Sequence, residues 1–416
     1  MRTLLVLTLL LVGCKERNTG YCVGMDCPDG PPMSCTESGP GCVCLNMVCV
    51  ECTTDDESNC GGTRPLCGDN NVCRACRSNA ECDESGACLE DGSCANATEV
   101  IYATPNGVAA GDCPQASPCS LAHALTVVNA PRDIIRLAPG TYNVPNSLDG
   151  LDFSITSATL VARGATLTRG AATVNGPIIS VRNGKTLKLV GGTLQGPNFT
   201  TDGIKCIENS KLAVHEVTIE SMRESGIEAD LCPLTVARST LRNNEQGGIN
   251  MPSASVATIT NNFVYRNGGV ASPIGGMRLK LAGGSKLELN TVVDNTSDQN
   301  PPSAGGIMCD GQGYDAPFNL VYRNAGGIGA EVQVIGTCTF RGSYQQFAMP
   351  SDNAVGFQNP AGATPSYRLT KTSPVGTIRD AFDCNDIDFE RDTRPSPSKA
   401  EGGKCDFGAD EYREGQ

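Results

Sequence analysis

The amino-acid sequence predicts an all-β protein: a right-handed parallel β-helix solenoid with an N-terminal capping helix, preceded by a small disulfide-rich module. A glycine followed by an aliphatic residue recurs at intervals of 21 to 30 residues, at Gly203-Ile204, Gly226-Ile227, Gly248-Ile249, Gly276-Met277, Gly306-Ile307 and Gly327-Ile328. Such a period is typical of single solenoid coils with variable loops. Fourteen of the 23 cysteines lie within residues 22–94, which contain no Phe, Tyr or Trp. That segment cannot bury a sufficient apolar core, so disulfides must hold it.

Residues 1–13 have the features of an export signal. Arg2 is followed by an apolar run over residues 4–12, which is too short to span a bilayer. The sequence Leu11-Val12-Gly13-Cys14 resembles a bacterial lipobox, which implies cleavage before Cys14, lipidation of Cys14 and a tether over residues 14–21. We therefore expect a lipoprotein of the cell envelope, at the outer membrane or the cell surface. The alternative is an ordinary secretory signal in which Cys14 is accidental.

Residues 22–95 form the cysteine-rich module. Setting Cys14 aside leaves 23 − 1 = 22 cysteines, an even number, and an exported chain meets an oxidising compartment, so we expect paired thiols. The spacing predicts two tandem units that share Cys73. They are Cys49-x2-Cys52-x7-Cys60-x6-Cys67-x5-Cys73 and Cys73-x2-Cys76-x5-Cys82-x5-Cys88-x5-Cys94. Asp, Asn, Gly and Ser between the cysteines favour turns.

A zinc site is the second interpretation of this module, because Cys49-x2-Cys52 and Cys73-x2-Cys76 are separated as in a zinc ribbon. Further cysteines at regular spacing, the absence of histidine and the oxidising compartment favour disulfides instead. Residues 42–94 resemble the small cysteine-rich repeats of myxobacterial secreted proteins. The resemblance implies a stalk or a protein-contact role and no chemistry.

The net charge of −13 is concentrated in the cysteine-rich module. Residues 22–94 hold 13 Asp and Glu against 3 Lys and Arg, a local balance of 3 − 13 = −10, and the middle of the chain is close to neutral. Nucleic-acid binding needs a basic stripe, which this sequence lacks, so we expect no nucleic-acid partner. We expect a monomer that contacts the membrane through the lipid on Cys14.

The β-helix is predicted over residues 96–380. Successive side chains of a β-strand point to opposite faces, so every second side chain points into a narrow core. Alternating strands follow the glycine pairs at Leu212-Ala213-Val214, Leu234-Thr235-Val236, Val256-Ala257-Thr258 and Leu287-Glu288-Leu289. Stacked turn residues can share hydrogen bonds from coil to coil, and the candidates are Asn243, Asn262, Asn290 and Asn319. A β-sandwich would space its strands by about 8–12 residues, so the longer period favours the solenoid.

A solenoid must also cover its open ends. Residues 120–130 predict a short amphipathic helix that begins after Ser120 as N-cap. Its apolar face would comprise Leu121, Ala124, Leu125 and Val128. We expect this helix to lie over the N-terminal coil, before a first strand at residues 133–137.

Two further motifs mark the ends of the solenoid. The opening motif is Pro118-Cys119-Ser120-Leu121 with Ala124-Leu125 and residues 134–142, and the closing motif is Asp386-Ile387-Asp388, Arg394-Pro395 and Asp406-Phe407-Gly408-Ala409-Asp410-Glu411. Over about residues 100–412 the chain resembles the bacterial β-helix proteins of the pectin-lyase-like superfamily called choice-of-anchor Q proteins. The resemblance implies the fold, and activity in that group is mostly unassigned. Phe389-Glu390 and the pair Cys384 and Cys405 depart from the pattern. We expect the acidic tail, residues 381–416, to close the β-helix.

Four polar residues follow the glycine–aliphatic pairs and should stack on one exposed face: Lys205, Glu228, Asn250 and Arg278. We expect this face to bind an extracellular polysaccharide or a surface protein. Asp230 follows Glu228 by two positions, so the two carboxylates would lie about 7 Å apart, a separation that inverting glycosidases use. Glu228 and Asp230 as acid and base, with Lys205, are the candidate catalytic residues. A merely hydrated polar ladder is the alternative.

We expect no cofactor. The alternative is a Ca²⁺ ion in the tail, where Asp386, Asp388 and Glu390 offer the carboxylate oxygens that this ion prefers. An exposed acidic tail is, however, more often only hydrated. His123 and His215 belong to no catalytic motif and are expected to be structural.

The eight cysteines after the module suggest four disulfides. Cys206 and Cys232 are 26 residues apart and Cys309 and Cys338 are 29 apart, close to one coil each. Adjacent coils stack at about 4.8 Å, which a disulfide can span. Cys113 with Cys119 should close a short loop, and Cys384 with Cys405 should close the acidic tail. Buried free thiols are the alternative for each pair.

The sequence therefore predicts a non-catalytic surface lipoprotein whose β-helix binds an extracellular polysaccharide or protein. A polysaccharide lyase or glycoside hydrolase acting on the Lys205 to Arg278 face is the second hypothesis. A structural, adhesin-like protein is the third.

Overall fold

The computed structural model of this chain divides into two compact units, Met1–Thr98 and Glu99–Gln416. The export signal, Cys14, the tether over residues 14–21 and Cys384 lie outside the described residues. The structure describes residues 43–45, 48–50, 52, 53, 57, 60–69, 71–144, 149–151, 153, 155–170, 175–197, 200–269, 272–297, 303–326, 333–346, 353–362, 365–370, 373, 387–392, 394 and 405–412. No helix in these residues is long and apolar enough to cross a membrane.

Two small repeats held by disulfides make up most of the described part of the first unit. In each repeat the first cysteine pairs with the third and the second with the fourth. The bonds are Cys52–Cys67, Cys60–Cys73, Cys76–Cys88 and Cys82–Cys94. The expectation that two units share Cys73 is therefore wrong, because each repeat keeps its own four cysteines. The zinc interpretation is also wrong, since Cys52, Cys73 and Cys76 have no free thiolate to offer a metal.

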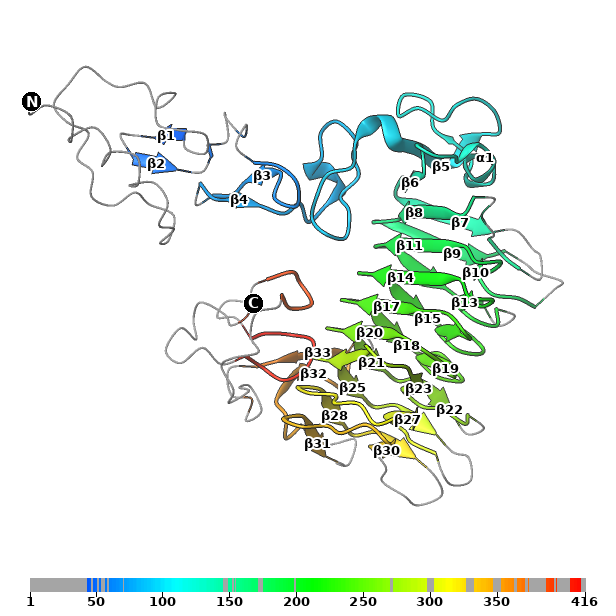
Figure 1. Ribbon diagram of the computed structural model, residues 1–416, viewed down its shortest axis with the longest axis vertical. Coiled ribbons are helices and arrows are strands. Elements are labelled where there is room, and N and C mark those ends of the chain that lie inside the picture. The colour runs from blue at the N-terminus through cyan, green and yellow to red at the C-terminus, as the bar shows by residue number, and fades with distance from the viewer. Residues whose placement is uncertain are drawn as a thin grey trace, which may run out of the picture. The chain divides into compact units, whose positions relative to one another are not determined.

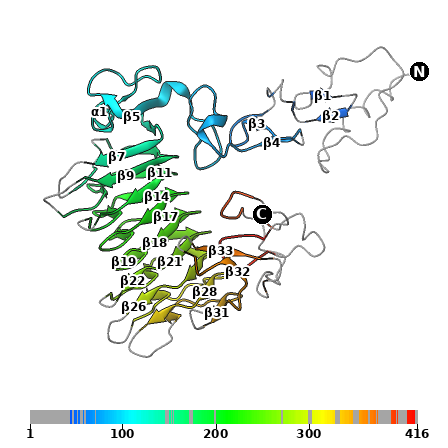
Figure 2. The same cartoon turned by 180° about the vertical axis from the view of Figure 1, so that it is seen from behind.

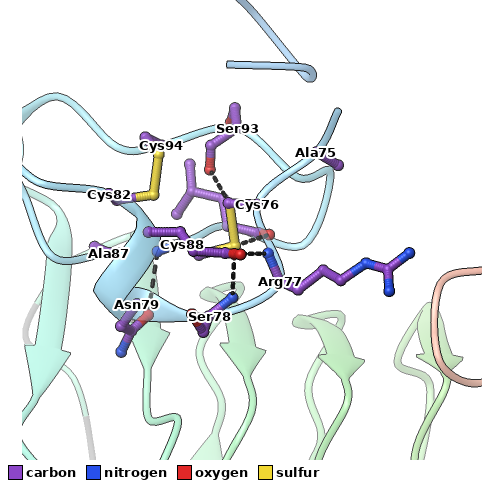
Figure 3. The surroundings of a disulfide bond; sticks show 12 residues. Ala75, Cys76, Arg77, Ser78, Asn79, Cys82, Ala87, Cys88, Ser93 and Cys94 are labelled. Carbon is purple, nitrogen blue, oxygen red and sulfur yellow. Dashed lines mark hydrogen bonds between the residues drawn. A yellow bond between two sulfur atoms is a disulfide. The ribbon is translucent and has the colours of Figure 1, made fainter. Parts of the chain in front are cut away.

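Little regular structure accompanies these disulfides. The elements are β1 (Val43–Leu45) antiparallel to β2 (Val48–Val50), β3 (Leu66–Cys67) antiparallel to β4 (Cys73–Arg74), and the 3-10 turns η2 (Asn79–Glu81) and η3 (Ala97–Glu99). In the second repeat the Asn79 side-chain oxygen accepts the backbone N–H of Cys88 at 3.1 Å, beside the Cys76–Cys88 bond (Figure 3). Cys76 and Cys88 are fully buried, so the sulfur atoms take the place of an apolar core.

The second unit is a parallel β-helix, which confirms the predicted fold class. Strands of three parallel sheets succeed one another around each coil, and successive coils stack along one axis (Figures 1 and 2). Sheet 1 contains β10 (Ile179–Val181), β13 (Ile204–Cys206), β16 (Ile227–Ala229), β19 (Ile249–Ser255), β23 (Met277–Leu281), β27 (Ile307–Gly311) and β30 (Val334–Gly336).

The other two sheets complete each coil. Sheet 2 contains β5 (Val100–Val108), β6 (Ile134–Leu137), β8 (Ser157–Val161), β11 (Thr186–Val190), β14 (Lys211–His215), β17 (Leu234–Ala237), β20 (Ala257–Thr260) and β24 (Lys286–Glu288). Sheet 3 contains β7 (Gly140–Val144), β9 (Ala165–Arg169), β12 (Thr193–Gln195), β15 (Thr218–Glu220), β18 (Thr240–Arg242), β21 (Phe263–Tyr265), β25 (Thr291–Val293), β28 (Leu320–Tyr322) and β31 (Tyr344–Gln346). A small sheet joins β22 (Gly268–Gly269), β26 (Thr296–Ser297) and β29 (Ala325–Gly326).

The core is one continuous stack of apolar side chains inside the coils. Each inward residue lies on its equivalent in the next coil, as Leu187 pairs with Leu212 and Leu212 with Leu234. All three are at most 2% exposed. Full burial of a leucine contributes about 2 kcal/mol, so each stacked coil adds to the stability of this unit.

Two ladders of buried side chains hold the coils in register at the corners. The first contains Ser239, Asn262, Asn290, Asn319 and Ser343, and the second contains Asn244, Asn267, Asn295, Asn324 and Gln333. Along most of each ladder, an asparagine donates its backbone and side-chain N–H groups to the amide oxygen of the residue one coil further along. Asn262, for example, donates both to Asn290 Oδ1.

The ladders confirm three of the four predicted corner asparagines, Asn262, Asn290 and Asn319. The prediction for Asn243 is wrong by one residue, because Asn244 is the buried ladder member. Asn243 is exposed and has a φ of 55°. In other coils, too, the residue before the ladder position has a positive φ, although it is mostly not glycine. These residues are Glu216, Arg238, Asn261, Leu289, Phe318, Ser221, Arg266, Asp294 and Arg323.

Two strand registers also differ from the prediction. Val256, expected to begin an alternating strand, is 42% exposed, and Ala257 and Ile259 are the inward residues of β20. Gly327-Ile328 lies outside the described residues, and Val334 of β30 is the residue that pairs with Ile307 of β27. At Val256 the alternation shifts after a register irregularity in β19 between Met251 and Ser255, which a fixed period cannot reveal.

The capping helix is present as α1 (Leu121–Val127), and its N-cap Ser120 accepts the backbone N–H of His123. Its buried residues Leu121, Ala124 and Leu125 join the core at the end of the solenoid where β5 lies (Figure 1). The expected first strand at residues 133–137 is in fact the second, because β5 precedes α1 and pairs with β6. Pro105 and Gly107 within β5 conceal it in the sequence.

The described residues of the C-terminal segment lie on the side of the β-helix, whereas the tail was expected to close its end. The hairpin of β32 (Phe357–Asn359) and β33 (Ser366–Leu369) packs on the outer face of sheet 3 near β21, β25 and β28 (Figures 1 and 2). Tyr265 contacts Tyr367 at 4.8 Å between ring centroids, and Phe263 contacts Phe389 at 4.9 Å. In these coils aromatic side chains point outward, so the segment covers an apolar surface that water would otherwise meet.

A buried carboxyl pair in this segment predicts a pH dependence. Burial and the neighbouring Asp410 carboxylate raise the pKa of Glu390 to about 8. The folded chain therefore keeps a proton that the unfolded chain has lost, and the free energy of unfolding falls as the pH rises from about 4.5 to about 8. Glu390→Gln should remove this fall, so its Tm should exceed that of the wild type most at alkaline pH. Equal Tm differences at acidic and alkaline pH would contradict the assignment.

Candidate functional site

The four predicted ladder residues do lie side by side on the outer face of sheet 1. Lys205 pairs in register with Glu228, Glu228 with Asn250, and Asn250 with Arg278. Their neighbours Ile204, Ile227, Ile249 and Met277 point into the core and are fully buried. Parallel strands lie about 4.8 Å apart, so the row presents one polar side chain per coil along the axis.

Two ion pairs involve this row, one between two of its members and one to Asp310. Lys205 Nζ lies 3.1 Å from Glu228 Oε1, and Arg278 Nε donates to Asp310 Oδ2 at 3.1 Å. Burial lowers the pKa of Lys205, but the hydrogen bond and the charge of Glu228 outweigh it, and the pKa is raised. Asn250 Oδ1 has no hydrogen-bond partner in the described part of the chain.

An acidic cluster that the sequence analysis missed adjoins this row. Carboxylate oxygens of Asp202, Glu224 and Glu228 all lie within 4.8 Å of one another. Asp202 is 1% exposed, its Oδ1 accepts the backbone N–H of Ser225, and its Oδ2 has no hydrogen-bond partner among the described residues. Burial, followed by the charges of Glu228 and Glu224, raises the pKa of Asp202 to about 7.

The local fold explains why these carboxylates meet. Asp202 and Glu224 lie in the loops that enter sheet 1 in successive coils, and Glu224 N donates to Thr201 O at 2.8 Å. Their signal in the sequence is weak. They precede Gly203 and Gly226 by one and two residues, so aligning the coils on the glycine pairs would have brought them together.

Glu228 and Asp230, the predicted catalytic pair, differ in their surroundings. Glu228 points toward Lys205, Asp202 and Glu224, which are its close charged partners. Asp230 follows β16, and its backbone N–H donates to Cys206 O at 2.9 Å. Asp230 Oδ1 is buried and has no hydrogen-bond partner in the described residues. The geometry therefore favours Glu228 as a member of the acidic cluster.

The Ca²⁺ candidates of the tail serve the chain itself where they are described. Asp386 lies outside the described residues. Asp388 is fully buried, and its Oδ1 accepts the backbone N–H groups of Glu390 and Asp392. The Glu390 carboxyl group contacts the Arg368 guanidinium. These carboxylates are not exposed, contrary to the expectation of a hydrated acidic tail.

Three of the four predicted disulfides occur in the β-helix. Cys206–Cys232 and Cys309–Cys338 each join neighbouring coils, and Cys113–Cys119 closes the loop before α1. Cys405 is disulfide-bonded, and its predicted partner Cys384 lies outside the described residues. The period of the coils was thus sufficient to find both pairs that link coils.

Neither histidine belongs to the acidic cluster of Asp202, Glu224 and Glu228. His123 Nε2 lies 2.9 Å from Gly111 O, which ties α1 to the loop that precedes it. His215 is the last residue of β14 in sheet 2.

One comparison, with a family model, agrees with the predicted right-handed coils over the residues that it matches. The family model described as a right-handed β-helix region matches residues 202–346. The chain is similar to the crystal structure of pectate lyase Pel9A, with a TM-score of 0.39, 16% identity, and coverage of 76% of this chain and 96% of that one. A rhamnogalacturonan lyase gives a TM-score of 0.30 and 9% identity, covering 61% of this chain and 90% of that one. No curated protein sequence matches the chain.

Proposed function

We propose that this chain is a surface-anchored lipoprotein whose β-helix binds an extracellular polysaccharide along the outer face of sheet 1, without cleaving it. The stacked row of Lys205, Glu228, Asn250 and Arg278 carries the proposal. A row that repeats hydrogen-bonding groups from coil to coil suits a polymer that repeats its own hydroxyl and carboxylate groups. Asn250 supports this, because its amide oxygen has no hydrogen-bond partner among the described residues.

The electrostatics of the row favour binding over catalysis. A general base works best with a pKa near the working pH, and the pKa of Lys205 is raised rather than lowered. Arg278 is engaged by Asp310. A lyase or hydrolase acting on this face remains the second candidate, and Asp202, whose pKa is about 7, is the group that favours it.

The ligand is identified by probing a glycan array with the full chain and measuring the Kd of any hit. Arg278→Ala should weaken binding about tenfold, which corresponds to about 1.4 kcal/mol, because a charge-assisted hydrogen bond is lost. Arg242→Ala is the matched control, since Arg242 forms a similar ion pair with Glu220 on sheet 3. Equal losses in both variants would place the ligand elsewhere, and cleaved sugars in mass analysis would favour the enzyme.

The proposed anchor is tested independently of the ligand. The native protein should partition into the detergent phase, because the sulfur of Cys14 would carry the acyl chains. A Cys14→Ser variant should be found in the aqueous phase or as a full-length precursor. Equal partitioning of the two proteins would remove the anchor from the proposal.

A further inference from the structure

We infer that Asp202, Glu224 and Glu228 hold a divalent cation, and that Lys205 neutralises this site when the cation is absent. Cation binding would free the Lys205 ammonium for an anionic group on the ligand. The binding of the cation is independent of the proposed function. Only the use of the freed Lys205 ammonium to bind the ligand rests on the proposed function.

The carboxylate geometry supports the cation. Three carboxylate oxygens within 4.8 Å of one another would repel each other without a positive charge between them. Calcium takes about six to eight oxygen ligands, so three carboxylates leave positions for water and for ligand oxygens. The loops that carry Asp202 and Glu224 are bonded directly to each other, because Asp202 Oδ1 accepts the Ser225 N–H at 3.1 Å.

Asp202 is the observation that separates this cluster from a chance gathering of surface acids. A carboxylate that is 1% exposed should have partners for both oxygens, because a buried charge without them is costly. Oδ2 of Asp202 has none among the described residues. A cation bound by this oxygen would satisfy it, whereas the exposed acids of the cysteine-rich module need no such partner.

Lys205 compensates only part of the negative charge of the cluster. Its Nζ lies 3.1 Å from Glu228 Oε1, and it leaves a formal cluster charge of −3 + 1 = −2, which a divalent ion would balance. The Lys205 side chain is 37% exposed, so it can swing toward solvent on its flexible stem. A cation on Glu228 would repel the ammonium and turn it toward the row that contains Asn250 and Arg278.

The expected ligand group is a carboxylate. A cation with open coordination positions, a released lysine and Arg278 would together place positive charge along one face of sheet 1. A carboxylated polysaccharide could then bind the cation and Lys205 at once. Binding would therefore require the cation, although no new protein contact forms.

Calorimetric titration of calcium chloride into the full chain tests the site. One cation should bind per chain, and Asp202→Asn should weaken its affinity at least tenfold. Lys205→Gln should instead bind calcium about tenfold more tightly, because the competing ammonium is gone. Lys280→Gln is the matched control, since Lys280 lies exposed on β23 outside the cluster, and it should leave the affinity unchanged.

Acylation of lysines, mapped by mass spectrometry with and without calcium, tests the release. Lys205 should react several-fold faster with calcium bound, and Lys280 should react equally in both conditions. Absence of calcium binding by the wild type, or equal affinities in the wild type and Lys205→Gln, would overturn the inference. Calcium-independent polysaccharide binding that Arg278→Ala weakens would also overturn it while leaving the proposed function intact.

Discussion

Replacing Asn267 by Ala is expected to lower the free energy of unfolding by about 4 kcal/mol. Asn267 lies between Asn244 and Asn295 in the second ladder and is 1% exposed. Its side chain donates to Leu241 O and to Asn295 Oδ1, and its oxygen accepts two N–H groups of Asn244. A buried polar group left without a partner costs about 1–3 kcal/mol, and the variant leaves several.

Denaturant unfolding followed by circular dichroism measures this loss. The control is Asn243→Gly, which keeps the positive φ of an exposed corner residue outside the ladder and should change stability by less than about 0.5 kcal/mol. Comparable losses in the two variants would show that the ladder contributes little and that apolar stacking alone sets the register.

Replacing Arg394 by Met should release the C-terminal segment from sheet 3, at a cost of about 3–5 kcal/mol. Arg394 and Glu411 form an ion pair at 3.5 Å whose side chains are both fully buried. The guanidinium also donates to Asp406 O and Gly408 O at 2.9 and 2.8 Å. Removing one partner of a buried pair leaves the other charge uncompensated, which is more costly than losing the attraction itself.

Limited proteolysis and thermal unfolding together measure this release. New cleavage within residues 353–412, before the coils themselves unfold, is the expected pattern for Arg394→Met. Arg341→Met removes the arginine of an exposed pair with Asp315, at 3.8 Å, and should change stability by less than about 0.5 kcal/mol. A segment that stays protected in Arg394→Met would show that the aromatic contacts hold it unaided.

The repeating parts of this fold could be predicted from the sequence, because stacking forces equivalent positions to recur. Lys205, Glu228, Asn250 and Arg278 were placed in one row by their distance from the glycine pairs alone. The same periodicity gave the pairing of Cys206 with Cys232. In each case one coil predicts its neighbour, so no information about distant contacts is needed.

The parts that do not repeat were not predicted. β5 was missed because it contains Pro105 and Gly107, and a Cβ at Gly107 would lie 2.0 Å from the Cys119 backbone, a contact known only from the folded chain. The cluster of Asp202 and Glu224 was missed because both lie in loops of unequal length. The docking of the C-terminal segment depends on which side of sheet 3 carries aromatic residues. That side can be identified only when the strand register is known.

Coil length in this protein varies at one corner far more than at the others. Only two residues separate sheet 2 from sheet 3 in successive coils, as between His215 and Thr218 or between Ala237 and Thr240. The connection from sheet 3 to sheet 1 differs in length from coil to coil. It is short between Arg242 and Ile249 and longer between Tyr265 and Met277. Insertions can therefore accumulate at this corner during evolution without disturbing the stacked asparagines. Because Asp202 and Glu224 lie there, recognition can diversify while the scaffold stays constant.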